Sequence, residues 1–139
     1  MFCKHGVCLG FKMMDACESP RTAFDILVRR FRHIPKLLIY DNACKLHLFC
    51  LKREPKRFSE SRFMVDRLHY RKGHIGCSLG YSMDSYKHDD DIASINSQAN
   101  EQANASLRRL TTQLAYMSPS NVIRHTSTFL ALRNMDKKV

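Results

Sequence analysis

The sequence lacks a long apolar run: nowhere do about 18 apolar residues follow one another, which argues against a membrane-spanning helix. It also lacks a recognisable signal peptide, because the opening MFCKHGVCLGFKMM is too short and is interrupted by Lys4 and His5. No internal repeat is present. With 44% hydrophobic and 26% charged residues among 139, the composition fits one globular domain with a modest core. We therefore expect one domain over residues 1–139 in a soluble intracellular protein, with no membrane partner.

Acidic residues are scarce relative to basic ones. Asp and Glu number 13 against 23 Lys and Arg, which gives a formal net charge of +10. The basic excess falls in three blocks, at residues 29–36, 52–57 and 67–72. Such clustering favours a polyanionic partner, with DNA first, through neutralisation of phosphates. Basic blocks also occur as solvated helix ends or as membrane-surface patches, so charge alone leaves these alternatives open.

Six cysteines are present without a secretory signal, which favours reduced thiols in the nucleus or cytoplasm over disulfides. A zinc site is one use for them, since imidazole and thiolate are the usual zinc ligands. The candidate ligands are His69, His74 and Cys77, with His88 nearby and with Cys44, or Cys3 and His5, available to complete four. The spacing matches no standard zinc finger and no paired C-x-x-C occurs. The alternative is a basic, histidine-bearing loop without metal.

Apolar periodicity predicts strands alternating with helices. Strands are expected at residues 7–14, 36–40 and 62–66, and helices at residues 20–31, 42–53 and 95–117 and from residue 119 onward. Between them, residues 67–91 show no clear period and are predicted to form an irregular loop. Because such alternation is typical of parallel strands joined by crossovers, the sequence predicts an α/β sheet of about three strands with packed helices and two C-terminal helices.

Asp41 follows the apolar run KLLIY at the expected carboxyl end of a buried strand. In an open parallel sheet, ligands bind beyond the carboxyl ends of the strands, which makes Asp41 a candidate for chemistry. Asp is also a frequent N-cap of a following helix, and the pattern alone favours this structural role.

Four segments carry a resemblance to a known family. HGVCLGF, PKLLIYDNACKLHLFCLKREP, DRLHYRKGHIGCS and INSQANEQANASLRRL, in this order, resemble the C-terminal half of the transposase domain of Kyakuja-Dileera-Zisupton elements and of host proteins derived from them. The resemblance spans residues 5–134. It implies an RNase H-like fold and a DDE triad of acids.

The resemblance implies roles for four residues. Asp41 matches the second acid of the triad, Glu101 in NEQAN matches the glutamate, and Asp66 and His69 match an Asp-x-x-His motif of related transposases. In such enzymes two Mg²⁺ or Mn²⁺ ions, held by carboxylates, activate a water or a 3′-hydroxyl and stabilise the leaving oxygen. The pattern allows a second interpretation of Glu101, as a solvated residue one turn before Arg108.

The first acid of the triad is expected on a strand that precedes residue 1. The resemblance therefore implies a partial domain that is inactive alone, completed by a missing N-terminal segment or by a homo-oligomer. Two functions remain open at this point. The first is a nuclear, transposase-derived domain for DNA binding and strand transfer by metal-dependent phosphoryl transfer. The second is a non-catalytic module that binds DNA or a protein, with zinc as a possible stabilising ion.

The segment after the third expected strand is a candidate DNA surface. Arg67, Tyr70, Arg71 and Lys72 combine cations with an aromatic ring that can stack on a base. The alternative is a surface segment with ordinary solubilising charges.

Overall fold

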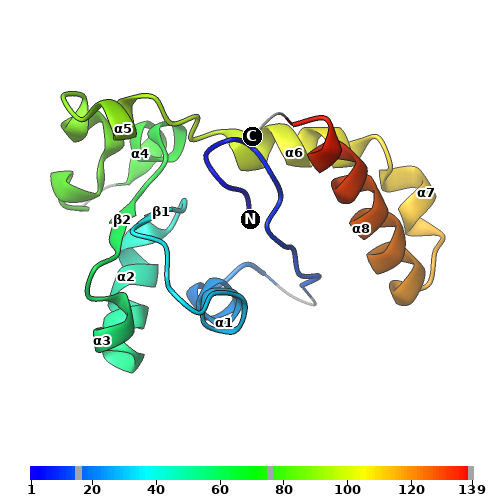
Figure 1. The fold of residues 1–139 in the computed structure, drawn as a ribbon, viewed down its shortest axis with the longest axis horizontal. Helices are drawn as coiled ribbons and strands as arrows, with labels where there is room; N and C mark the ends of the chain where they lie inside the picture. Colours follow the sequence, from blue (N-terminus) through cyan, green and yellow to red (C-terminus); the bar gives the residue numbers. More distant parts are fainter. Residues whose placement is uncertain (15–16, 75–76, 138–139) are drawn as a thin grey trace. The chain divides into compact units, whose positions relative to one another are not determined.

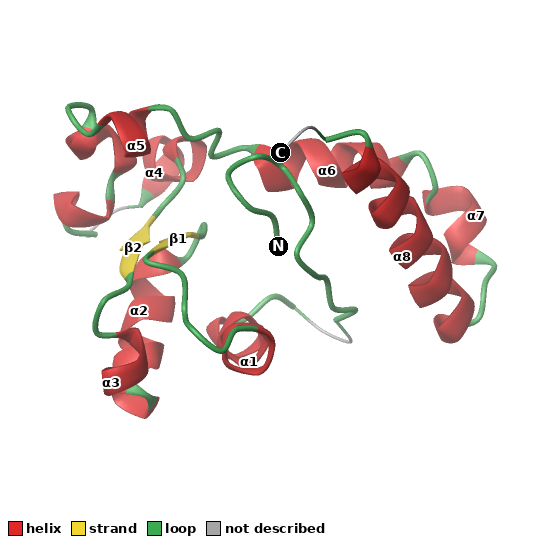
Figure 2. Ribbon diagram, in the orientation of Figure 1, coloured by secondary structure: helices red, strands yellow, loops and turns green. Residues whose placement is uncertain are grey.

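The computed structural model describes residues 1–14, 17–74 and 77–137, which fall into two compact units. Unit 1 comprises Met1–Met13 and Gln98–Val139, and unit 2 comprises Met14–Ser97 (Figures 1 and 2). Unit 2 contains α1 (Pro20–Arg30), β1 (Leu37–Ile39), α2 (Ala43–Arg53), α3 (Pro55–Phe58), β2 (Arg62–Met64), α4 (Arg67–Gly73) and α5 (Asp90–Ala93), with 3-10 turns η1 (Leu79–Tyr81) and η2 (Met83–Tyr86). Unit 1 contains α6 (Ala99–Arg108), α7 (Thr111–Ala115) and α8 (Pro119–Met135).

Helix α1 begins and ends as its sequence signals require. Ser19 is the N-cap, its hydroxyl accepts from the Thr22 amide, and Pro20 occupies the first helical position. At the other end the guanidinium of Arg57, from α3, donates to the carbonyl oxygens of Val28 at 2.8 Å and Phe31 at 2.7 Å. These carbonyls lack partners within the helix, so Arg57 caps α1 from a neighbouring element.

The sheet has two parallel strands in the described residues, where about three were expected. Leu37 pairs with Arg62, Leu38 with Phe63 and Ile39 with Met64. The sheet agrees with a mixed α/β fold, but β1 is half-buried along its length, so the prediction of a strand buried on both faces was wrong.

The strand predicted at residues 7–14 does not form; that segment contributes only to a single antiparallel bridge between Phe2 and Cys8. The Cys8 amide donates to Asn134 Oδ1 at 2.7 Å, and the Cys8 carbonyl accepts from Asn134 Nδ2 at 2.9 Å. The Asn134 side chain, from α8, thus pairs with both the N–H and the C=O of Cys8. These groups therefore do not require a neighbouring strand. Arg133 adds a bond of 2.9 Å to the Gly6 carbonyl, which fixes the segment to α8.

The core of unit 2 lies beside the sheet. Met64, Met83 and Ile92 are buried together, and Leu37, Ile39, Tyr86 and Ile95 pack against them. On α2, Ala43, Leu46 and Cys50 are buried, which holds one face of this helix inward and leaves Cys44 and His47 at the border of the core. The buried residues recur at intervals of three and four, as on one face of an amphipathic helix.

Two predictions about the second half of the chain were wrong. Residues 67–91 are not one irregular loop, because Asp66 caps a helix, α4, that begins directly after it. The helix expected over residues 95–117 is divided: Ile95 packs on the core of unit 2, and α6 begins at Ala99. α6 ends in a 3-10-like turn, with the Leu110 amide donating to the Leu107 carbonyl at 2.9 Å.

Helix α8 forms where it was expected, with Ser118 as N-cap and Pro119 at the first position. Of its side chains, Thr126 and Leu130 are buried. Within the part of the chain that is described, no helix has both the length and the apolarity to cross a membrane.

Candidate metal centre

Three side chains of unit 2 bring metal-binding atoms together. Cys44 lies in the first turn of α2, His74 is the C-cap of α4, and Cys77 follows three residues later. Their donor atoms all lie within 4.8 Å of one another, with His74 Nδ1 at 3.0 Å from Cys77 Sγ and 3.9 Å from Cys44 Sγ. Among residues 1–14, 17–74 and 77–137, this is the one set of three such donors.

A backbone carbonyl orients the imidazole of His74. Its Nε2 donates a hydrogen bond of 2.7 Å to the carbonyl oxygen of Asp41, which leaves the lone pair on Nδ1 directed at the two sulfurs. The Tyr70 ring lies parallel to it, with centroids 6.2 Å apart and planes 4° from parallel. Histidines that bind metals are commonly held in this way, by donating the second ring N–H to a carbonyl or carboxylate.

The surroundings of the Cys77 thiol favour its protonated form. Burial raises the pKa of the Cys77 thiol to about 11, and the neighbouring Cys44 adds to this increase. The thiol proton of Cys77 is thus available to the lone pair on His74 Nδ1. A metal ion at this point would replace that proton, because thiolate is the form of cysteine that binds metal.

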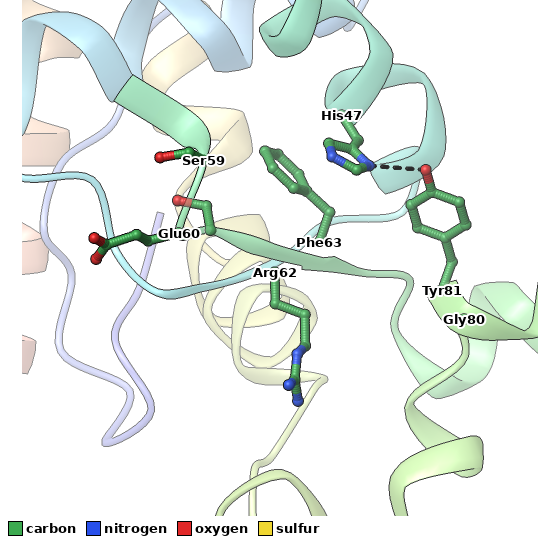
Figure 3. A pocket seen from close by; sticks show the side chains of 8 residues that line it. His47, Ser59, Glu60, Arg62, Phe63, Gly80 and Tyr81 are labelled. Carbon is green, nitrogen blue, oxygen red and sulfur yellow. Dashed lines mark hydrogen bonds between the residues drawn. The ribbon is translucent and has the colours of Figure 1, made fainter. Parts of the chain in front are cut away.

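A second polar pair lies next to the cluster. The Tyr81 hydroxyl and His47 Nδ1 share a hydrogen bond of 2.9 Å, and the His47 ring stacks on Phe63 at 4.6 Å between centroids. Burial lowers the pKa of His47, and burial, followed by the neighbouring Cys44 and Cys77, raises the pKa of Tyr81. Both side chains line a cavity of about 430 Å³ (Figure 3). No sequence pattern predicted this pair, because His47 and Tyr81 lie 34 residues apart.

Of the three zinc candidates from the sequence, His74 and Cys77 come together and His69 does not join them. Cys44, one of the residues weighed to complete the set, takes the third place. His69 is held elsewhere because its Nδ1 pairs with Asp66 Oδ2 at 2.5 Å.

Asp41 lies in the turn directly after β1, as expected. Its Oδ1 accepts from the Asn42 amide at 2.8 Å, whereas the N-cap of α2 is Asn42, which forms no side-chain cap bond. The capping role favoured by the pattern is therefore not adopted by Asp41. Its main-chain oxygen, which no sequence pattern reveals, is the partner of His74.

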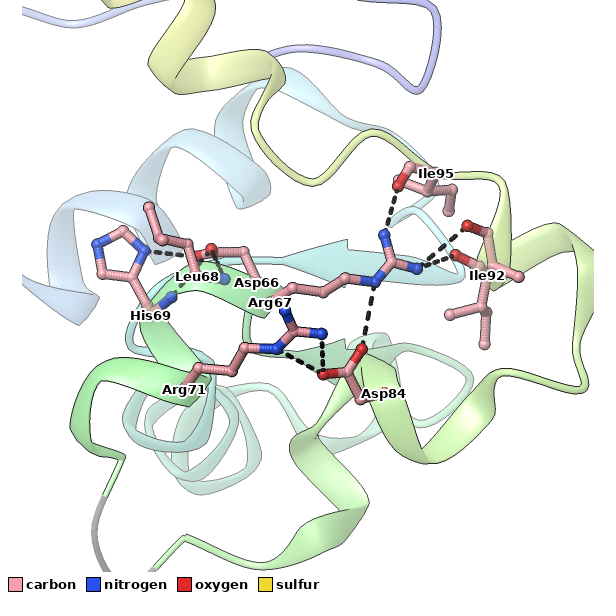
Figure 4. Close-up of polar contacts among 9 residues, drawn as sticks. Asp66, Arg67, Leu68, His69, Arg71, Asp84, Ile92 and Ile95 are labelled. Atoms are coloured by element: carbon pink, nitrogen blue, oxygen red, sulfur yellow. Dashed lines mark hydrogen bonds and ion pairs between the residues drawn. The ribbon is translucent and has the colours of Figure 1, made fainter.

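Asp66 follows β2 and is the N-cap of α4. Its Oδ1 accepts from the amides of Leu68 at 2.9 Å and His69 at 3.2 Å, and the residue is only 8% exposed (Figure 4). Because β1 and β2 are parallel neighbours, Asp41 and Asp66 follow them at the same edge of the sheet. Glu101 lies exposed in the first turn of α6, in the other unit, so its pairing with Asp41 around magnesium stays a prediction.

The capping bonds predict a stability cost at Asp66. Replacement by alanine should lower the free energy of unfolding by about 1–2 kcal/mol, because two amides at the start of α4 lose their acceptor. Asp66→Asn should cost less, since an amide oxygen also caps. Denaturant titration measures both, and Asp91→Ala, at an exposed acid of α5, is the control. An alanine variant as stable as the native protein would contradict the capping role.

The four predicted DNA-binding residues lie on one helix, α4. Arg67 donates to the carbonyls of Ile95 at 3.0 Å, Ile92 at 3.2 Å and Ala93 at 3.1 Å, and lies 3.6 Å from Asp84. Arg71 donates to the same carboxylate from Nε and Nη2, at 3.0 and 2.8 Å (Figure 4). Tyr70 faces His74, and Lys72 is exposed. The two arginines thus have internal partners, and their contact with DNA stays a prediction.

Comparison with protein-family models, curated proteins and solved structures gave no match for this chain. Its function is therefore inferred from its own residues.

Proposed function

We propose that the chain is a zinc-stabilised DNA-binding module, derived from the RNase H-like transposase domain that its sequence resembles. The observation that carries this proposal is the cluster of Cys44, His74 and Cys77, which joins the start of α2 to the end of α4 and the segment after it. A metal ion there would tie these separate parts of a small unit together, which is how structural zinc adds to folding energy.

The donor set fits zinc better than magnesium. Two sulfurs and an imidazole nitrogen are soft or borderline ligands, whereas Mg²⁺ prefers oxygen. Zinc bonds of about 2.3 Å to sulfur and 2.0 Å to nitrogen place neighbouring donors roughly 3.5 Å apart. The distances of 3.0 and 3.9 Å from His74 Nδ1 to the two sulfurs bracket that value.

The charge of the chain supports DNA as the partner, since a net +10 on 139 residues attracts a polyanion. A nuclear location goes with this function. Strand transfer is the second candidate function, favoured by the position of Asp41 and Asp66 at the same sheet edge. It requires two Mg²⁺ ions and further acids, and Asp66 already uses both of its oxygens within α4.

DNA binding should weaken steeply as salt rises. If about six phosphates are neutralised, the affinity for a random-sequence duplex should fall roughly 1,000-fold between 50 and 200 mM salt, because bound counterions are released. Fluorescence anisotropy with the zinc-loaded chain measures this. A weak or salt-independent interaction would remove DNA binding from the proposal. Incubation of the same complex with Mg²⁺ tests strand transfer: nicking that disappears in Asp41→Asn would support the second candidate.

A further inference from the structure

Exposed cations of unit 2 gather where α1 ends and where α2 passes into α3. We define this basic corner by six exposed residues: Arg29, Arg30, Arg32, Lys52, Arg53 and Lys56. They come from two of the three basic blocks of the sequence, which lie about 20 residues apart along the chain.

Direct contacts hold the two blocks side by side. The guanidinium of Arg57 reaches from α3 to the carbonyls of Val28 and Phe31, within and just after the last turn of α1. Beneath the cations, the Phe24 ring of α1 stacks on Phe58 at 5.8 Å and meets Phe49 edge-on at 5.4 Å. The cations of the corner are therefore carried by elements that pack against one another.

The corner carries more positive than negative charge: two acids lie near its six cations in sequence, Asp25 one turn before Arg29 and Glu54 next to Arg53. The described residues form four ion pairs, and all of them lie elsewhere, on Arg62, Arg67, His69 and Arg71. Helix ends explain part of the corner, because Arg29, Arg30, Lys52 and Arg53 are in last turns, where the helix dipole favours cations. Lys56 is likewise in the last turn of the four-residue α3, whereas Arg32 lies beyond the end of α1.

We propose that the basic corner is the surface that binds the phosphate backbone of duplex DNA, ahead of the residues on α4. This inference rests on the proposed function and names the surface at which the DNA would bind. On α4, Arg67 and Arg71 already share Asp84, whereas the corner offers free guanidinium and ammonium groups. Its aromatic rings pack against one another and Arg53 lies 3.5 Å over Phe49, so the exposed chemistry is charge and hydrogen-bond donors. Contacts of this kind recognise phosphates without reading base sequence.

The experiment compares two triple variants with equal loss of charge. Arg29→Gln, Arg32→Gln and Lys56→Gln neutralise the corner, and Arg71→Gln, Lys72→Gln and Lys87→Gln neutralise exposed cations on or after α4. Both triples, and the native chain, are loaded with zinc, checked for equal melting temperature, and titrated with a random-sequence duplex at several salt concentrations.

We expect the corner triple to lose roughly 100-fold in affinity at 150 mM salt, with a slope of log affinity against log salt that is smaller by about 3. The other triple should change little. An equal loss in both triples, or a loss confined to the α4 triple, would overturn the assignment while DNA binding by the chain stands. A native chain that ignores DNA but binds vesicles of anionic lipid through the corner would also overturn it. A native chain that binds neither would refute the proposed function itself.

Discussion

Cys77→Ser should bind zinc at least about 100-fold more weakly than the native chain, because it removes one of three metal-binding side chains, and even indirect support of a ligand is worth 10–100-fold. With free zinc near 100 times the native dissociation constant, a 100-fold loss of affinity removes roughly 2.3 kcal/mol of stabilisation. For a unit of this size the melting temperature should fall by about 10–20 °C. Thermal melting with and without added zinc measures the difference.

Two comparisons show whether the loss arises through the metal. In the presence of a chelator, the native chain and Cys77→Ser should melt alike, because neither then holds zinc. Cys17→Ser is the matched control, as Cys17 is an exposed thiol of the same unit outside the cluster. Metal analysis of tag-free native protein should give one zinc per chain. A native chain without zinc, or a Cys17 variant as weak as the Cys77 variant, would contradict the site.

Arg67→Met should destabilise unit 2 by roughly 2–4 kcal/mol, since hydrogen bonds from a charged donor are worth about 1.5–3 kcal/mol each and partial exposure reduces this value. The aliphatic part of the side chain is kept, so the loss reports the guanidinium. That group joins the start of α4 to three carbonyls around the end of α5. Chemical denaturation measures the change.

Arg71→Met is the matched control, because Arg71 contacts the same carboxylate, Asp84, but its side chain is 65% exposed. A surface pair of this kind is worth at most about 1 kcal/mol. Equal losses in the two variants would mean that the shared ion pair, and not the bonds to the carbonyls, gives Arg67 its effect.

Local signals predicted the elements that have strong local causes. Ser19 and Pro20 mark the start of α1, Ser118 and Pro119 that of α8, and the apolar runs before Asp41 and Asp66 form the two strands. These elements are determined by capping, proline geometry and periodicity within a few residues.

The errors arose where distant residues decide the structure. Cys8 is paired by the side chain of Asn134, 126 positions away, and nothing near Cys8 in the sequence indicates this. Ile95 packs against the core of unit 2. It therefore does not belong to the helix that the spacing of apolar residues from Ile95 onward predicted. α4 was not predicted because its residues are mostly polar and show no apolar periodicity. Asp66, its N-cap, was the one local signal for a helix start.

The metal centre was predicted in part. The pattern supplied His74 and Cys77 because they are close together in sequence, and it placed His69 with them for the same reason. Spatial proximity instead brings in Cys44, 30 residues before His74. The tautomer that directs Nδ1 to the sulfurs depends on the carbonyl oxygen of Asp41, a group that every residue possesses and that composition therefore does not reveal.

Substitution of Asp41 and substitution of Asp66, the two acids that follow the strands, would have different consequences for the fold. Any residue at position 41 provides the carbonyl that His74 uses, so a related chain can lose this carboxylate and keep the arrangement of Cys44, His74 and Cys77. At position 66 the carboxylate itself begins a helix, so selection for folding alone retains it. Under the strand-transfer proposal, an aspartate at position 66 of a related chain therefore says little about enzymatic activity, whereas an aspartate at position 41 is informative.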